Sequence, residues 1–323
     1  MGGGEQLVIA GYGDIGRRVA ALALARGQRV AALTRSPEAT AFAERQGVEI
    51  IPGDLDRSDG PVVGLPTAGA TVLYAAPPPG GGDSDPRVRV FCGSIEPGAE
   101  PRRVIYLSTS GVYGDCAGAL VDETTPARGT TARARRRLDA ESVLKNWGDH
   151  RGVAITILRV SAIYGPGRFP FDRLLGHHPV LAEAESPLSN RIHADDLARI
   201  CLAAANWTAS GDLINVSDGE ALTMTAYFDA VAAAFGLPRP PRVSRRAAAA
   251  VMSPLMLSYF SESRRLENRR LRQRLGTPLL YPDLAHGLAA AVAAGVTPVQ
   301  PLGRTALPTL DTVAEPHEKT TGF

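Results

Sequence analysis

Three glycines near the start of the chain have the spacing that a backbone needs to hold a diphosphate. Gly11, Gly13 and Gly16 form Gly-x-Gly-x-x-Gly, between an apolar run at 7–10 and a helical pattern. In such a strand–turn–helix unit the first glycine permits a tight turn, the second lets the backbone approach a pyrophosphate, and the third lets helix and strand pack closely. The pyrophosphate would lie on free N–H groups at the start of the helix. The expected dinucleotide contacts are Gly11, Tyr12, Gly13, Asp14, Ile15 and Gly16.

An arginine at the tip of the next predicted strand indicates which dinucleotide binds. The strand covers 28–33 and continues into Thr34 and Arg35. NAD sites commonly place Asp or Glu about 20 residues after the glycine motif to bind the ribose 2′-hydroxyl, whereas an arginine accommodates a 2′-phosphate. Arg35 therefore favours NADP(H) over NAD(H), which stays the alternative. Alternatively, Arg35 is a solvent-exposed loop residue with no role in cofactor binding.

The elements that position these residues alternate between strand and helix. The predicted strands cover 7–10, 28–33, 48–51, 70–75 and 103–107. Because these strands are apolar throughout, they predict a parallel sheet with helices on both faces, an α/β fold of the Rossmann type. Ligands gather beyond the carboxyl ends of such strands, where Arg35, Asp54 and 75–77 fall.

Composition narrows the range of partners. The chain of 323 residues carries 35 basic and 33 acidic side chains, which argues against a nucleic acid or another polyanion. Three widely spaced cysteines suggest reduced thiols without zinc, and the His177–His178 pair has no third ligand, so no metal is expected. No leader or membrane segment is evident, and we expect a cytoplasmic protein.

Several further motifs occur in a recognisable order. They are Ser108-Thr109-Ser110-Gly111-Val112-Tyr113-Gly114-Asp115 and the segments 157–168, 191–198 and 214–219. With these residues the chain resembles the extended and atypical short-chain dehydrogenase/reductase superfamily, in its NAD(P)-dependent epimerase/dehydratase branch. The resemblance covers about residues 6 to 290. It implies a small, mostly helical C-terminal lobe that closes over the cofactor and selects the substrate.

The resemblance also implies roles for individual residues. Thr109 falls at the active-site Ser/Thr position, where its hydroxyl would bind a substrate oxygen. The segment 159–164 would pass the nicotinamide end. Arg168 at the cleft mouth and His193 in the supporting wall are candidate substrate-binding residues. The further cofactor contacts implied are Asp54 and Leu55 beside the adenine, Ala75, Ala76 and Pro77 along the ribose and nicotinamide, and Ser108.

One motif of the superfamily is missing. Its members carry Tyr-x-x-x-Lys and then Glu on the helix after the Thr109 loop, so that the cation lowers the phenol pKa for proton exchange. With Glu141 as the anchor, Arg133 and Arg137 take the tyrosine and lysine positions. Arginine stays protonated, so it can hold an anion but cannot exchange the proton.

Two interpretations of this departure stay open. In one, an unusual oxidoreductase uses Tyr113, Thr109 or Tyr164 as proton donor, and the arginines hold an anionic substrate. In the other, the arginines form a solvated helix face paired with carboxylates at 139 and 141. The function indicated is an NADP(H)-favouring oxidoreductase or epimerase/dehydratase-like enzyme; the alternative is a non-catalytic NADP(H)-binding sensor.

The second half of the chain is expected to form the lobe that binds the substrate. Helical patterns cover 169–175, 191–205, 223–235 and 261–275, with Arg264, Arg265, Arg269 and Arg270 on the last of them. We expect a Rossmann domain over 1–165, with its sheet completed by segments at about 190–216. A substrate lobe is expected over 166–295 and a flexible tail over 296–323. A homodimer is usual in the superfamily.

Overall fold

A single parallel sheet forms the centre of the molecule, in the computed structural model that describes residues 6–56, 60–207, 211–276 and 278–298. Its seven strands lie in the order β11-β7-β5-β4-β1-β2-β3. They are β1 (Gln6–Ala10), β2 (Arg29–Thr34), β3 (Glu49–Pro52), β4 (Thr71–Tyr74), β5 (Arg103–Thr109), β7 (Ala154–Val160) and β11 (Leu213–Val216). The chain builds outward from β1 on one side and from β4 on the other. The crevice between the ends of β1 and β4 is therefore the switch point where such sheets bind ligands.

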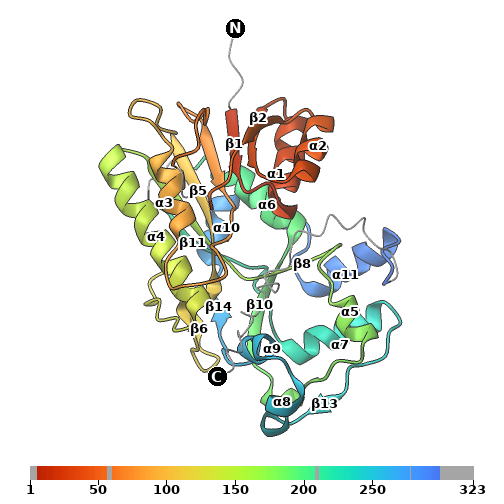
Figure 1. Ribbon diagram of the computed structural model, residues 1–323. Coiled ribbons are helices and arrows are strands. Elements are labelled where there is room, and N and C mark those ends of the chain that lie inside the picture. Colours follow the sequence, from red (N-terminus) through yellow and green to blue (C-terminus); the bar gives the residue numbers. More distant parts are fainter. Residues whose placement is uncertain (1–5, 57–59, 208–210, 277, 299–323) are drawn as a thin grey trace, which may run out of the picture.

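Helices cover both faces of this sheet (Figure 1). One face carries α1 (Asp14–Ala25), α2 (Pro37–Arg45), α6 (Ala194–Ala204) and α10 (Arg269–Leu275). The other carries α3 (Pro86–Gly93) and α4 (Ala132–Arg151). The predicted α/β fold of the Rossmann type is confirmed.

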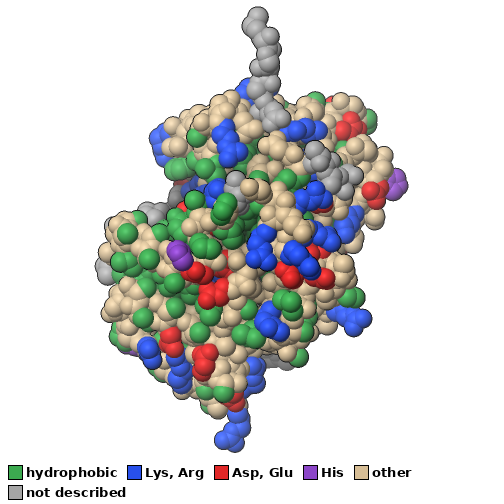
Figure 2. Space-filling model, turned by 180° about the vertical axis from the view of Figure 1, so that it is seen from behind, with side chains coloured by type: hydrophobic (Ala, Val, Ile, Leu, Met, Phe, Trp, Pro, Cys, Tyr) green, Lys and Arg blue, Asp and Glu red, His purple; other side chains and the backbone are tan. Residues whose placement is uncertain are grey.

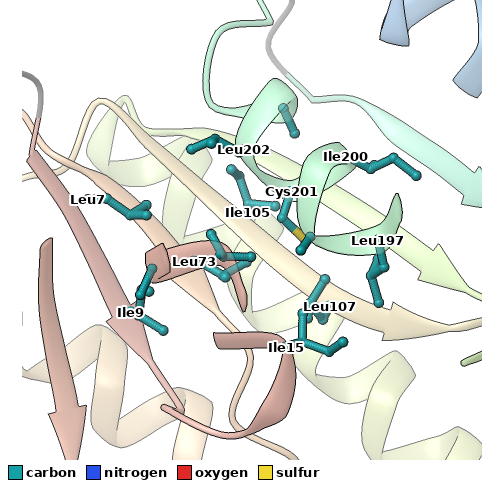
Figure 3. Close-up of a cluster of buried hydrophobic side chains, with 14 of the residues drawn as sticks. Leu7, Ile9, Ile15, Leu73, Ile105, Leu107, Leu197, Ile200, Cys201 and Leu202 are labelled. Atoms are coloured by element: carbon teal, nitrogen blue, oxygen red, sulfur yellow. The ribbon is translucent and has the colours of Figure 1, made fainter. Parts of the chain in front are cut away.

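The core under α1 and α6 is continuous. Figure 3 shows Leu7, Ile9, Leu73 and Ile105 of the sheet beside Ile15 of α1 and Leu197 of α6. All six side chains are buried, so the sheet and both helices share one apolar layer. This layer fixes the starts of α1 and α6 at the same edge of the sheet.

The rest of the chain builds a second, smaller layer with its own core. Three strands form a sheet in the order β12-β10-β8, and two pairs, β13-β9 and β14-β6, lie beside it. The strands are β6 (Leu120–Val121), β8 (Ala162–Tyr164), β9 (Val180–Leu181), β10 (Leu188–His193), β12 (Ala221–Thr223), β13 (Arg242–Val243) and β14 (Arg265–Leu266). The helices are α5 (Phe171–Leu175), α7 (Met224–Ala234), α8 (Arg245–Val251), α9 (Pro254–Tyr259) and α11 (Leu284–Ala293), with two 3₁₀ turns, η1 (Ser110–Tyr113) and η2 (Glu183–Glu185).

Two predicted helices were wrong at their starts. Residues 191–193 end strand β10, which pairs with β8 and β12, and α6 begins only at Ala194. Within 261–275, the N–H of Arg265 donates to the carbonyl of Ala119, just before β6, and that of Glu267 to the carbonyl of Val121 in β6, so strand β14 precedes α10. Arg264 and Arg265 therefore do not lie on that helix. The sheet is completed by β11, whereas β10 belongs to the smaller sheet.

Within the described residues, no helix is long and apolar enough to cross a bilayer. The same residues contain no cluster of His, Cys, Asp and Glu placed to hold a metal ion. On the face that Figure 2 shows, basic side chains lie close to acidic ones, in keeping with the near-neutral balance. Residues 299–323 of the predicted tail lie outside the described residues.

Candidate active site at the carboxyl edge of the sheet

The glycine loop leaves no room for side chains. Gly11 has φ +103°, and a Cβ there would lie 2.4 Å from the amide nitrogen of Ala76. The N–H groups of Ala75 and Ala76 both donate to the carbonyl of Ala10, at 2.8 and 2.9 Å. A Cβ on Gly16 would lie 2.7 Å from the carbonyl oxygen of Gly11. The ends of β1 and β4 and the start of α1 are thus held together backbone to backbone.

The start of α1 is free to receive an anion. Gly13 is its N-cap residue and provides no side-chain cap. The first N–H groups of a helix have no partner within the helix, and the helix dipole adds positive potential there. This geometry fits the pyrophosphate of a dinucleotide, because a phosphate oxygen can take the place of the missing cap.

A cluster of two arginines and two carboxylates lies at the tips of β2 and β3. Arg35 donates to Asp56 at 2.6 Å and to Asp54 at 3.3 Å. Arg87 donates to Asp56 at 2.5 Å and to the carbonyl of Pro77 at 2.6 Å. The hydrogen bond from Arg87 contributes most to a lowered pKa of Asp56. The structure thus brings Arg35, Asp54 and Pro77 into one neighbourhood.

Asp56 and Arg87 were not predicted as site residues. Asp56 lies two positions after the predicted Asp54, and this proximity could have identified it as a site residue. Arg87 directly follows Pro86 at the start of α3, and only the fold brings it to the tip of β3. Thr34 lies at the end of β2, where its hydroxyl accepts a hydrogen bond from the N–H of Ser36.

A buried ionic layer lies under the end of β5. Glu141 of α4 pairs with Arg159 of β7 at 2.8 Å and accepts a hydrogen bond from the Ser108 hydroxyl at 2.6 Å. The Arg159 guanidinium lies 4.8 Å from the ring centre of Tyr113, whose hydroxyl donates to Asn215 at 2.7 Å. Because Ser108, Glu141, Arg159 and Tyr113 are all buried, this layer holds α4 and η1 against the sheet.

Thr109 lies at the edge of this layer. Its hydroxyl oxygen caps η1 by accepting from the N–H of Gly111 at 3.2 Å, and its side chain is partly exposed. The hydroxyl proton can therefore be donated outward. Arg264 reaches the same turn from the C-terminal part of the chain, since a Cβ on Gly111 would lie 3.8 Å from its Nη2.

The arginines of α4 have separate partners. Arg137 donates to the carbonyl of Leu107 at 2.8 Å and to the Tyr106 hydroxyl at 3.2 Å. The Arg133 guanidinium lies 4.8 Å from the ring centre of Tyr259, on α9. Arg133 thus spans from α4 to the C-terminal lobe, and Arg137 supports the end of β5.

The predicted pairing of the α4 arginines with carboxylates of the same helix was wrong. Asp139 pairs with Arg89 of α3 at 2.6 Å. Glu141 pairs with Arg159, as described above. Both carboxylates turn away from the arginine face because their partners lie on α3 and on the sheet.

Tyr164 and His193 lie side by side and are buried. The Tyr164 hydroxyl donates to the carbonyl of Asp283 at 3.0 Å, and burial raises its pKa. His193 caps α6 by accepting from the N–H of Asp195 on Nδ1, which leaves the proton on Nε2. Burial lowers the pKa of His193, while Asp195 opposes the shift.

Arg168 lies beside the glycine loop. Its Nε donates to Asp14, the first residue of α1, at 2.6 Å. The structure therefore brings Arg168 to the predicted cofactor loop, across 154 residues of sequence. No such contact was predicted.

Comparison with known proteins defines the class. A family model described as NAD(P)H-binding matches residues 11–207, and this chain belongs to that family. The NAD(P)-binding domain that the resemblance implies is thereby confirmed, and the solved structures described below share its fold. The chain is 27% identical over 126 residues to human dTDP-D-glucose 4,6-dehydratase, covering 36% of each. It is 25% identical over 181 residues to Escherichia coli Protein YeeZ, covering 56% of this chain and 59% of YeeZ.

Solved structures extend the likeness to nearly the whole chain. A functionally unknown conserved protein from Silicibacter pomeroyi is 31% identical with a TM-score of 0.74, covering 91% of this chain and 100% of the other. MoeE5, solved with UDP-glucose and NAD, is 21% identical with a TM-score of 0.69 and coverages of 90% and 98%. Thermotoga maritima UDP-glucose 4-epimerase, solved with UDP-glucose, is 16% identical with a TM-score of 0.71 and coverages of 89% and 97%. The last two likenesses show the fold.

Proposed function

We propose that this chain is an NAD(P)-dependent oxidoreductase or epimerase/dehydratase-like enzyme with a small anionic substrate. The observation that carries the proposal is the backbone contact between Gly11 and Ala76 beside the uncapped start of α1. That arrangement forms a cradle for a dinucleotide at the switch point of the sheet. The contacts of Arg35 with Asp54 and of Arg87 with the Pro77 carbonyl near the same edge support the proposal.

The chain's own residues would bind and orient the substrate. A bound nicotinamide would supply hydride acceptance or donation. Thr109 would donate a hydrogen bond to the reacting oxygen, because its hydroxyl oxygen already accepts from the N–H of Gly111 and its side chain is partly exposed. Arg133 would bind a carboxylate or phosphate of the substrate, as planar guanidinium groups do. Arg137 would hold the end of β5 in place through the Leu107 carbonyl.

Arg35 supports a preference for NADP(H). Its side chain is 55% exposed at the tip of β2, where a 2′-phosphate would reach it. Asp54 and Asp56 already neutralise part of its charge. We therefore expect a modest preference with NAD(H) still accepted.

A sensor without catalysis is the second candidate. The hydroxyl groups of Tyr113 and Tyr164 are buried and donate to Asn215 and to the Asp283 carbonyl. Neither phenol is placed to exchange a proton with a substrate. This observation favours a protein that binds the dinucleotide and reports its level through a partner.

Turnover separates the two candidates. The purified chain is incubated with NADP⁺ or NADPH and a panel of small anionic alcohols, ketones and nucleotide sugars, and nicotinamide absorbance and product masses are followed. Conversion that Thr109→Val slows strongly supports the enzyme. Tight dinucleotide binding without conversion across the panel favours the sensor. A lobe division at about residue 165, a homodimer and a cytoplasmic location belong to the same proposal.

A further inference from the structure

Four charged side chains link the cofactor helix to two distant segments. Asp14 accepts from Arg18 at 2.9 Å and from Arg168 at 2.6 Å. Arg18 also donates to Asp195 on α6 and, through Nη2, to the carbonyl of Pro166 at 3.2 Å. We call this set, Arg168–Asp14–Arg18–Asp195, the Asp14 ion chain. It ties α1, α6 and the loop at 165–168 together at one edge of the sheet.

The loop that carries Arg168 has a defined conformation. Gly165 has φ +129°, and a Cβ there would lie 2.8 Å from Nε2 of His193. The N–H of Arg168 donates to the carbonyl of Gly165 at 2.9 Å, which closes the turn. His193 is itself held as the cap of α6. The loop backbone therefore presents Arg168 toward the start of α1.

The guanidinium of Arg168 is anchored on one side only. The hydrogen bond to Asp14 uses Nε, and the side chain is 31% exposed. Among the described residues, no acceptor is bonded to its two terminal nitrogens. These are the groups with which an arginine binds two phosphate oxygens at once. The hydrogen bond from Nε to Asp14 sets the orientation of the guanidinium. The two terminal nitrogens, which form the fork of the guanidinium, stay free to bind an anion.

Asp14 looks out of place at the start of a pyrophosphate-binding helix. A carboxylate there interacts favourably with the helix dipole, but it repels a phosphate. Burial alone would raise the pKa of Asp14, yet Arg168 and Arg18 bring its pKa below the ordinary value. The carboxylate therefore stays charged and bonded to both arginines at neutral pH.

We infer that Arg168 binds the pyrophosphate of the dinucleotide and that Asp14 is the positioning residue that aims it. This inference rests on the proposed function only in that the chain binds a dinucleotide. It assigns Arg168 to the cofactor rather than to the substrate. The carboxylate acts through the arginine, so its removal costs affinity although it removes negative charge.

Binding measurements on four variants test this inference. Dissociation constants for NADPH and NADH are measured by calorimetry on the full chain. Arg168→Gln and Asp14→Asn are each expected to weaken binding by roughly tenfold or more, as loss of a charged hydrogen bond does. The double variant is expected to bind no more weakly than Arg168→Gln alone. Arg168→Lys restores only part of the affinity, because it lacks the fork.

Matched controls separate this effect from general electrostatics and from misfolding. Asp229→Asn and Arg242→Gln remove the partners of another half-exposed ion pair, in the C-terminal lobe, and are expected to leave affinity unchanged. Adenosine 2′-monophosphate, which keeps the adenosine end of NADPH but has no phosphate at the pyrophosphate position, is expected to bind the Arg168→Gln variant and the wild type with similar affinity. Thermal melts report whether each variant is folded.

Three results would overturn the inference. Tighter or unchanged NADPH binding by Asp14→Asn means that the carboxylate only repels the phosphate or plays no part. Unchanged binding by Arg168→Gln means that the arginine is not a ligand. Equal weakening for adenosine 2′-monophosphate places Arg168 at another part of the cofactor. A wild-type chain that binds no dinucleotide instead refutes the proposed function itself.

Discussion

The glycine crevice between β1 and β4 and the wall formed by α4 and β5 are built in opposite ways. The crevice is held by backbone against backbone, as in the 2.4 Å approach that a Cβ on Gly11 would make to Ala76. The wall is held by side chains, among them Glu141, Arg159 and Arg137. A backbone site tolerates few residue types, so it retains a motif, whereas a side-chain site can be rebuilt with other residues. This contrast accounts for a complete Gly-x-Gly-x-x-Gly motif beside a helix that carries Arg133 and Arg137 at the positions where Tyr-x-x-x-Lys was expected.

Gly13→Asp is the substitution expected to have the largest effect, because it places a carboxylate where the pyrophosphate meets the helix. We expect NADPH affinity to fall at least about a hundredfold, the scale of several kcal/mol. Calorimetric titration measures it. Gly93→Asp is the matched control, since a Cβ on Gly93 meets nothing within 4 Å. Unchanged affinity in Gly13→Asp would place the site elsewhere and remove the contrast.

Glu141→Gln tests the wall in the same way. It leaves Arg159 as a buried charge without its ion pair, so the free energy of unfolding is expected to fall by about 3–5 kcal/mol. Chemical denaturation measures this loss. The exposed pair of Arg89 with Asp139 is the control, and Arg89→Gln is expected to cost at most about 1 kcal/mol. Equal losses in both variants would show that the buried layer is not what holds the wall.

Thr109→Val is expected to lower turnover without changing NADPH affinity, and so to separate the function of the wall from that of the crevice. Turnover should fall by about tenfold to a thousandfold, in the range of a lost hydrogen-bond donor to the reacting oxygen. NADPH affinity should stay unchanged, because Thr109 caps η1 and not the cofactor helix. Thr109→Ser keeps the hydroxyl and is expected to keep most of the activity. Parallel losses of affinity and turnover would assign Thr109 to the cofactor.

A carboxyl group away from both regions makes stability depend on pH. Burial raises the pKa of Asp218, just after β11, to about 8. Because the folded state holds this proton more tightly than the unfolded chain, stability is greatest below about pH 4 for this group. It is lost as the pH rises toward 8. Asp218→Asn is expected to flatten this part of the denaturation profile, and an unchanged slope would contradict the assignment.

Arg35→Gln is expected to have the smallest effect. The ratio of NADPH to NADH affinity should fall by several-fold, about 1 kcal/mol, since Asp54 and Asp56 already offset the charge of Arg35. Titration with both dinucleotides measures the ratio. Arg45→Gln, on α2, is the control. An unchanged ratio would show that Arg35 belongs to the solvated loop after all.

The crevice could be predicted from the sequence because its determinants are local. The apolar strand, the three glycines and the following helix lie within one short segment, and β1, α1 and β2 match the expected elements. The starts of α6 and α10 were missed for a common reason. Ile192 directly precedes the apolar positions of α6, so periodicity alone does not separate the strand from the helix, and only pairing with β8 and β12 decides it.

The wall and the Asp14 ion chain could not be predicted in this way. Asp14 and Arg168 are 154 residues apart, and the partners of Asp139 and Glu141 come from α3 and β7. The fold decides which long charged side chains come close enough to pair, and the residue types alone do not identify these partners. Tyr113 and Tyr164 were candidate proton donors on residue type, yet both hydroxyls are buried against acceptors. The sequence did not show whether these two hydroxyl groups would be buried.

Titration of the purified wild-type chain with NADPH, NADH and their oxidised forms tests the central claim most directly. The crevice geometry predicts saturable one-site binding of the dinucleotides, with NADPH bound more tightly than NADH. Tighter binding of NADH would contradict the role given to Arg35 and leave the crevice in place. Binding of none of the four would contradict the account, because the cradle of Gly11, Gly13 and Ala76 would then hold no dinucleotide.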